Sequence, residues 1–192
     1  MLLAIIVGHE AVKPGVKAAF PIDCHEYEFN KNLAVDIYRY ARESNIDCRI
    51  FLRDGIGRSG VSNLVNAWIE DGLACSIELH LNAFDRWTRG TETLYIGHNL
   101  ESRRLAESVQ LNMVKVFRSS GVSKQNRGIK LLDELSRGYL NMRDIKCPSC
   151  LVEPVFADNL DEAQLLQSKR LEYARGLVSS AIEFLNNTGR LK

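Results

Sequence analysis

The chain has 192 residues, of which 45% are hydrophobic, enough for one sizeable core but too few for two typical enzyme domains. Its 25 Lys and Arg residues nearly balance 24 Asp and Glu residues, and the net charge of +1 argues against nucleic acid or an anionic membrane as a partner. The apolar start, Met1 to Val7, is too short for a signal peptide or a membrane span, so we expect synthesis in the cytoplasm without a membrane anchor.

The first half of the chain alternates between strand and helix patterns. Residues 2–7 form an apolar run that ends at Gly8-His9, which is typical of a buried strand. Helical spacing of apolar residues follows from about 28 to 45, and residues 48–52 form a second strand. The glycine-rich segment 53–60 lacks the residues of a phosphate-binding loop and is interpreted as a flexible connection. A short helix over 62–71, closed by Gly72, completes this half.

The second half continues the alternation. We expect strands over 76–83, 91–96 and 150–155, a brief pairing segment at 129–132, and no clear assignment for 135–142. Asn99 is a plausible cap for a helix over 100–119, which is followed by a loop over 121–128. Asn159 to Glu162 has the form of a capping box that opens a last helix to about 186. This order predicts an α/β fold, with a mostly parallel, twisted central sheet and helices on both faces.

One predicted strand, Ser76 to Ala83, has a wholly polar face. Alternate residues Ser76, Glu78, His80 and Asn82 share it, whereas Ile77, Leu79 and Leu81 share the other. Buried polar groups cost several kcal/mol unless each has a partner. The strand therefore either lies at an edge of the sheet, with this face in solvent, or lies inside it beside partners such as a metal ion.

Ionisable residues also follow other predicted strands. His9 ends the first strand, His80 ends the middle strand and Glu153 lies near the end of the last. Ligands bind outside the carboxyl ends of parallel strands, so these three groups should converge at one edge of the sheet. A loop that carries Cys24-His25-Glu26 can supply a further ligand. Two histidines and one carboxylate are a common set for catalytic zinc, which keeps a fourth position for water.

Five segments, in order along the chain, carry a resemblance to a known family. They are Val7-Gly8-His9; Glu26 to Asn30 (EYEFN); Ile77 to Ala83 (IELHLNA); Arg127 to Lys130 (RGIK); and Leu151 to Asn159 (LVEPVFADN). Together they resemble the zinc-dependent N-acetylmuramoyl-L-alanine amidases of the type-3 class, which include catalytic domains of phage endolysins. The resemblance runs along nearly the whole chain, so residues 1–192 are expected to form a single catalytic domain without a separate wall-binding domain.

The resemblance implies roles for individual residues. It makes His9, Glu26 and His80 the ligands of Zn²⁺, and Glu153 the catalytic glutamate. It also implies hydrolysis of the amide bond between N-acetylmuramic acid and L-alanine in peptidoglycan. Asn82 and the Arg127 to Lys130 segment match positions that line the substrate groove. An endolysin-like enzyme of this kind would be made in the cytoplasm and would act on the cell wall after its release.

Alternatives remain open at the level of residues. His25 and Glu28 are rivals to Glu26 as the third ligand, and Glu28 could instead favour the dipole of the first helix. Glu153 could be a structural carboxylate paired with an arginine, and Arg127 and Lys130 could be ordinary surface charges. His98, in a predicted turn, is interpreted as solvated.

Two positions depart from the pattern of the resembled family. Glu10 stands where small residues are frequent, and Glu78 replaces a serine that often precedes the second histidine by two residues. Both would add negative charge near the metal. The rival functions are another zinc hydrolase, such as a carboxypeptidase-like enzyme or a deacylase, and a peptidoglycan-binding module that has lost catalysis.

Cysteines play no part in this prediction. Five cysteines without regular spacing do not indicate a disulfide framework and suit a reducing compartment. Cys147 and Cys150 form a C-x-x-C motif that could be redox-active or half of a metal site. No second C-x-x-C motif completes a four-thiolate site, so a packing role is favoured for both.

Overall fold

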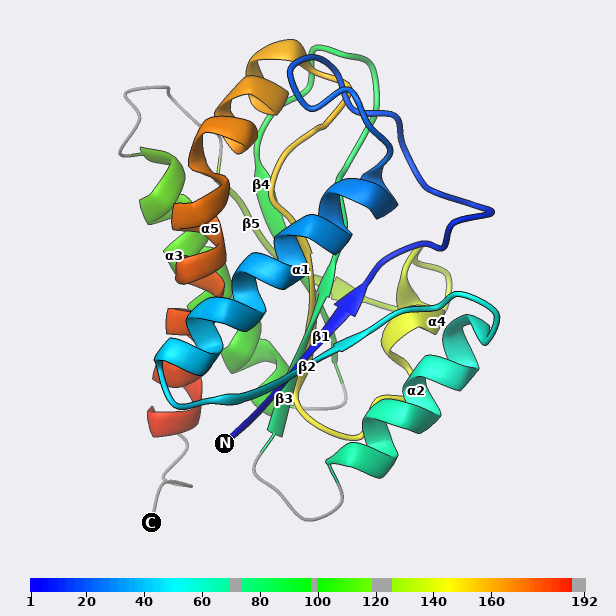
Figure 1. The fold of residues 1–192 in the computed structure, drawn as a ribbon, viewed down its shortest axis with the longest axis vertical. Helices are drawn as coiled ribbons and strands as arrows, with labels where there is room; N and C mark the ends of the chain where they lie inside the picture. Colours follow the sequence, from blue (N-terminus) through cyan, green and yellow to red (C-terminus); the bar gives the residue numbers. More distant parts are fainter. Residues whose placement is uncertain (70–73, 98–99, 119–125, 188–192) are drawn as a thin grey trace.

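The fold is that of a computed structural model, in which residues 1–69, 74–97, 100–118 and 126–187 are described (Figure 1). The elements in chain order are β1 (Leu2–Val7), α1 (Glu26–Glu43), β2 (Asp47–Phe51), α2 (Gly57–Trp68), β3 (Ala74–Leu79), β4 (Thr91–Ile96), α3 (Leu100–Arg118), β5 (Asn126–Leu132), α4 (Tyr139–Met142), β6 (Ser149–Glu153) and α5 (Leu160–Asn187). The predicted cap at Asn99 and helix end at Gly72 lie outside the described residues, as do His98 and most of the predicted 121–128 loop.

The strands form one six-stranded sheet in the order β2-β1-β3-β6-β4-β5. Neighbours run parallel except β4 and β6, which pair antiparallel with Glu92 opposite Glu153. Helices α1, α3 and α5 cover one face of the sheet, and α2 and α4 cover the other (Figure 1). The predicted α/β class, with a mostly parallel sheet between helical layers, is confirmed.

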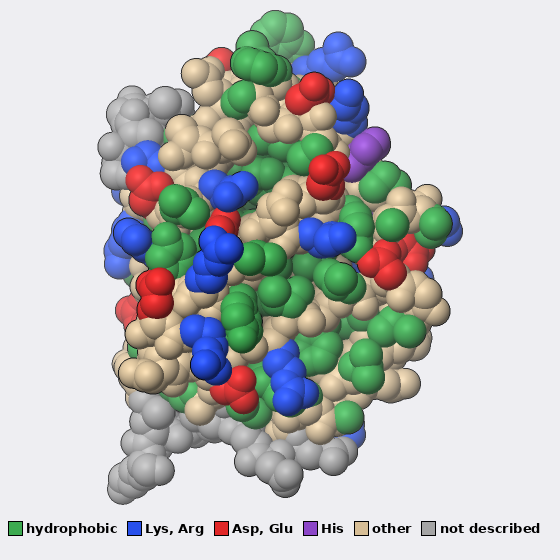
Figure 2. Space-filling model, viewed as in Figure 1, with side chains coloured by type: hydrophobic (Ala, Val, Ile, Leu, Met, Phe, Trp, Pro, Cys, Tyr) green, Lys and Arg blue, Asp and Glu red, His purple; other side chains and the backbone are tan. Residues whose placement is uncertain are grey.

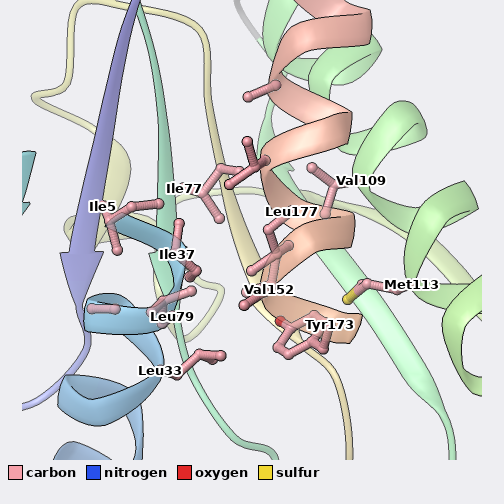
Figure 3. Packing of buried hydrophobic residues seen from close by; sticks show 14 of the residues in the cluster. Ile5, Leu33, Ile37, Ile77, Leu79, Val109, Met113, Val152, Tyr173 and Leu177 are labelled. Carbon is pink, nitrogen blue, oxygen red and sulfur yellow. The ribbon is translucent and has the colours of Figure 1, made fainter. Parts of the chain in front are cut away.

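Alternation along β1 divides the core between these two layers. Its residues Leu3, Ile5 and Val7 belong to the larger cluster, whereas Ala4 and Ile6 pack with α2. Figure 3 shows the larger cluster, where side chains from β1, β3 and β6 meet those of α1, α3 and α5. Burial on both faces explains why β1 is apolar at nearly every position.

The strand with the polar face lies inside the sheet. β3 pairs with β1 on one side and β6 on the other, and all six of its residues are buried. The edge-strand interpretation is therefore wrong. Its alternative, a buried strand whose polar side chains each find a partner, describes the structure.

Two helices differ from the prediction. The segment 53–60 was expected to be a connection throughout, but α2 begins at Gly57. Gly55 and Gly57 adopt positive φ and turn the chain, after which Val61 and Val65 pack against β1. This packing outweighs the low helix propensity of the segment. The region 135–142, left unassigned, contains the single turn α4, which Gly138 precedes with a φ of 93°.

The last helix begins as the sequence predicts. The Asn159 side-chain oxygen accepts hydrogen bonds from the backbone N–H groups of Asp161 and Glu162, at 3.1 and 3.2 Å. The Glu162 carboxylate also accepts one from the Gly90 N–H, at 3.0 Å, and so ties the start of α5 to the loop before β4.

All five cysteines are free thiols. Cys48, Cys75, Cys147 and Cys150 are buried, and burial raises the pKa of Cys147 to about 11 and that of Cys48 to about 12. Neutral buried thiols are weak nucleophiles and weak metal ligands, which fits the packing role favoured for the C-x-x-C motif.

Acidic and basic side chains are interspersed on the face that carries α1 and α5 (Figure 2). Arg103 pairs with Glu107 and Arg104 with Glu101 along α3, at 3.0 and 2.7 Å. None of the helices in the described part of the chain combines the length and apolar character that a membrane span requires.

Candidate active site

The site is built at the carboxyl ends of β1 and β3. His9 follows β1 after one glycine, and His80 directly follows β3. Glu26 begins α1, the helix that returns the chain to the sheet after β1. His9 adopts a φ of 64°, a left-handed conformation that is uncommon for residues other than glycine and tends to occur at functional sites.

The structure brings His9, Glu26 and His80 together. One potential ligand atom from each lies within 4.8 Å of the others. Glu26 lies between the histidines, with Oε1 3.0 Å from His80 Nδ1 and Oε2 3.2 Å from His9 Nε2. Two imidazoles and a carboxylate at this spacing are a suitable donor set for zinc.

Backbone groups hold the Glu26 carboxylate in place. Its Oε1 accepts a hydrogen bond from the Leu81 N–H at 2.8 Å, and its Oε2 accepts one from the Val16 N–H at 3.2 Å. Burial favours the protonated carboxyl, but the hydrogen bonds and charges of His80 and His9 outweigh it and lower the pKa of Glu26 to about 2. Glu26 is therefore a fixed anion at neutral pH.

His80 lies between two carboxylates. Its Nδ1 faces Glu26, and its Nε2 is 2.7 Å from Glu78 Oε1. Burial alone would lower the pKa of His80, but hydrogen bonds to Glu26 and Glu78 raise it to about 10 in the metal-free protein. Glu78 in turn forms a buried ion pair with Arg53. The negative charge expected from Glu78 is therefore compensated by Arg53. Burial raises the pKa of Glu78, but His80 and Arg53 outweigh burial and lower it.

Glycines allow the backbone to approach the three side chains. A Cβ added to Gly8 would lie 2.5 Å from His80 Nε2 and 2.5 Å from the Leu79 carbonyl oxygen. A Cβ on Gly15, which has a φ of 78°, would lie 2.4 Å from Glu26 Oε2 and 2.9 Å from His9 Cδ2. The space occupied by these side chains is thus space that only glycine leaves open.

The loop that carries His9 is tied to the neighbouring loop after β2. The Ala11 N–H donates to Asp54 Oδ1 at 2.9 Å, and the Tyr27 hydroxyl donates to the other oxygen of Asp54. The rival ligands His25 and Glu28 are both exposed. His25 directs Nδ1 to the Gly15 carbonyl oxygen at 3.2 Å, and it is not part of the cluster of His9, Glu26 and His80.

Glu153 lies at the end of β6, next to this cluster. Its Oε2 is shielded from solvent and has no hydrogen-bond partner among the described residues. Burial, together with the charges of Glu26, Glu92 and Glu78, raises its pKa to about 8, although the His80 charge acts in the opposite direction. None of the ion pairs among the described residues joins Glu153 to an arginine, so the alternative of a structural carboxylate paired with an arginine finds no support. A carboxyl with this raised pKa can hold and release a proton near neutral pH.

Comparison with known proteins places the chain in a family. The sequence model of the N-acetylmuramoyl-L-alanine amidase family, Amidase_3, matches residues 3–183. The chain belongs to this family. The match supports hydrolysis of an amide bond in peptidoglycan, the reaction that the sequence motifs imply. No protein with a curated description matches the sequence significantly.

Solved structures of other amidases share the fold. The N-acetylmuramoyl-L-alanine amidase from Clostridium difficile 630 is 21% identical with a TM-score of 0.81, and the match covers 98% of each chain. The catalytic domain of the amidase CwlV from Bacillus (Paenibacillus) polymyxa var. colistinus is 19% identical with a TM-score of 0.78, covering 97% of this chain and 99% of that one. The catalytic domain of the CD27L endolysin, which targets Clostridium difficile, is 22% identical with a TM-score of 0.73, covering 95% and 97%.

The three residues expected to bind substrate in this amidase gather on one carboxylate, Glu92 of β4. Asn82 Nδ2 donates to Glu92 Oε1 at 2.9 Å, while Arg127 Nε and Lys130 Nζ each lie 2.6 Å from Glu92 Oε2. The guanidinium of Arg127 also lies over the ring of Phe156, 5.0 Å from its centroid. The structure brings these residues to one place but engages them with Glu92.

Sequence reasoning missed Arg53, Glu92 and Asn141 of this amidase. Arg53 and Asn141 contact Glu78, and Glu92 collects Asn82, Arg127 and Lys130. The one available signal was that Arg53 comes two residues after the end of β2, at the same edge of the sheet as the histidines. Nothing local marked Asn141, which reaches the site from a helix of one turn, or Glu92, within a strand.

Proposed function

We propose that the protein is a zinc-dependent amidase that cleaves peptidoglycan between N-acetylmuramic acid and L-alanine. The observation that carries this proposal is the cluster of His9, Glu26 and His80, whose potential ligand atoms lie within 4.8 Å of one another. It fits zinc in donor type and number, and two glycines leave the required space. Family membership supports the reaction class.

In this proposal His9, Glu26 and His80 hold the ion. Zinc in such a set acts as a Lewis acid toward a carbonyl oxygen and toward water. Glu26 is suited to permanent coordination because the backbone N–H groups of Val16 and Leu81 hold its two oxygens in place beside the histidines.

Glu153 is proposed as the general base and acid. The ionised carboxylate would accept a proton from the attacking water, and the carboxyl so formed would deliver that proton to the nitrogen of the leaving L-alanine; a pKa raised toward neutrality suits both transfers. An amine leaves poorly without a proton, so delivery matters as much as attack. Oε2, with no partner of its own, is free to perform both transfers.

Asn82, Arg127 and Lys130 are proposed to line the substrate groove beside Glu153. Glu92 stands opposite Glu153 in the sheet, so the residues that bind Glu92 lie next to the proposed proton carrier. Lys130 keeps 43% of its side chain exposed and can donate to a substrate oxygen while it neutralises Glu92.

The test combines metal analysis with product analysis. The purified protein should hold one zinc per chain and should lose activity on treatment with a chelator. When it acts on purified peptidoglycan, it should release stem peptides that carry a new amino terminus on L-alanine. Intact sugar strands are expected. Release of free terminal amino acids would instead indicate a carboxypeptidase-like enzyme, and binding without any release would indicate an inactive wall-binding module.

A lytic, endolysin-like role on the wall after release from the cytoplasm is part of the proposal, with residues 1–192 acting as one catalytic domain. It is supported by the order of the five sequence motifs and by the fold shared with the CD27L catalytic domain. The purified protein added from outside should lower the turbidity of a suspension of bacterial cell walls. A suspension that stays turbid while isolated muropeptides are cleaved would contradict the lytic role alone.

A further inference from the structure

Glu78 and its partners form a buried polar cluster behind His80. Glu78 Oε1 is 2.7 Å from His80 Nε2 and accepts a hydrogen bond from Asn141 Nδ2 at 3.0 Å. The same oxygen contacts the Arg53 guanidinium. Glu78, Arg53 and His80 are each less than a tenth exposed. Arg53, Asn141 and the proposed ligand His80 therefore converge on one oxygen of Glu78.

This contact decides which ring nitrogen of His80 would keep its proton once a cation takes the place of the other. A carboxylate oxygen 2.7 Å from a bare imidazole nitrogen would bring two lone pairs together, so Nε2 must be a donor. Asn141 Nδ2 is 3.4 Å from Nε2 but 3.0 Å from Glu78, and its N–H donates to the nearer acceptor. The other nitrogen, Nδ1, is 3.0 Å from Glu26 Oε1 and donates to it in the metal-free protein. Nδ1 also faces the space shared with His9, so this is the nitrogen whose proton a bound cation would replace.

We propose that Glu78, held by Arg53 and Asn141, is a positioning residue that keeps the Nε2 proton on His80 and thereby presents Nδ1 to the metal. This inference rests on the proposed zinc-dependent function. A histidine ligand commonly donates its second N–H to a carboxylate, which fixes the ring orientation and increases its strength as a ligand.

A purely structural ion pair would be arranged differently. Arg53 can offer a carboxylate two parallel hydrogen bonds, one to each oxygen. Here Arg53, Asn141 and His80 share Oε1, while Glu78 Oε2 and Arg53 Nε have no hydrogen-bond partner among the described residues. The carboxylate is thus oriented toward the imidazole at the expense of its pairing with the guanidinium.

The first test needs no substitution. In the zinc-loaded wild-type protein, long-range ¹H–¹⁵N spectra of the histidine rings should show His80 with a protonated Nε2 and a metal-bound Nδ1. A spectrum with zinc on Nε2, or with the proton on Nδ1, overturns the inference. If the wild-type protein binds no zinc, the proposed function falls and this inference falls with it.

The second test measures zinc affinity by competition with a chromophoric chelator. Glu78→Gln should weaken binding by about 10- to 100-fold, the usual effect of losing such a partner. Asp36→Asn is the matched control, because Asp36 is a buried acid 2.9 Å from Arg170 Nε that lies outside the metal cluster. Wild-type protein that binds zinc, with Glu78→Gln folded and equally tight, refutes the positioning role and leaves the proposed function standing.

Discussion

Replacement of Glu153 by Gln should make the metal-free protein more stable than wild type, by a margin that grows as the pH rises from 4.5 to about 8. The folded-state pKa of about 8 lies above the ordinary value of 4.5 because Oε2 is buried without a donor. Below pH 4.5 the carboxyl is neutral in both states, so its titration costs nothing. Between these values the unfolded chain releases the proton and the folded chain retains it, and the wild-type protein therefore loses stability with rising pH.

The size of the effect follows from the two pKa values. At about 1.36 kcal/mol for each pH unit, the interval between 4.5 and about 8 corresponds to an upper limit of about 5 kcal/mol. Local rearrangement and water entry reduce such penalties, so we expect the Gln variant to gain roughly 2–4 kcal/mol over wild type between pH 4.5 and 8. The neighbouring charges titrate in both proteins and largely cancel in the difference.

Urea unfolding at a series of pH values, after removal of metal by a chelator, measures this difference. The slope with pH is the informative quantity, because an unpartnered Gln amide adds a cost that does not change with pH. Glu107→Gln is the control, since Glu107 pairs with Arg103 on an exposed helix face. If the stability difference between wild type and Glu153→Gln stays flat from pH 4.5 to 8, the assignment of Glu153 as a buried proton carrier is wrong.

Three further substitutions test the rest of the site. Glu153→Gln should retain zinc but lose about 10²- to 10⁴-fold in kcat, the typical contribution of a general acid and base, and near-normal turnover would contradict its role. Gly8→Ala should lower the zinc affinity and reduce the free energy of unfolding, measured by thermal unfolding, by at least about 2 kcal/mol, because its Cβ would lie 2.5 Å from both His80 Nε2 and the Leu79 carbonyl oxygen. A fully stable variant would show that the backbone can move away. Lys130→Met should raise KM for muropeptides several-fold with kcat unchanged, whereas the exposed control Arg103→Met should change neither.

The sequence was most informative where a local pattern and a fold rule coincide. The apolar run of β1 and the alternation of β3 gave both strands, and the rule that ligands lie outside strand ends brought His9 and His80 together. Glu26 could be separated from His25 and Glu28 only by the resemblance, because all three lie within one loop and helix turn. The structure separates them by burial: Glu26 is 2% exposed, whereas the other two are exposed.

Long-range features stayed out of reach of the sequence. The insertion of β6 between β3 and β4, antiparallel to β4, depends on packing across the whole sheet and leaves no local pattern. The contacts of Arg53 and Asn141 with Glu78 join positions 25 and 63 residues apart. Glu78 was therefore interpreted as added charge near the metal, because its compensating arginine could not be located from spacing alone.

Two glutamates of the same site are driven toward opposite roles by their surroundings. Glu26 has four donors around its oxygens, two from the backbone and two from histidines, and its pKa falls to about 2. Glu153 has an oxygen with no donor, and its pKa rises to about 8. A permanently ionised carboxylate suits a metal ligand, and a carboxyl that titrates near neutral pH suits proton transfer. The division of labour therefore follows from which donors reach each carboxylate, and a donor introduced beside Glu153 should lower its pKa and abolish proton delivery while leaving zinc bound.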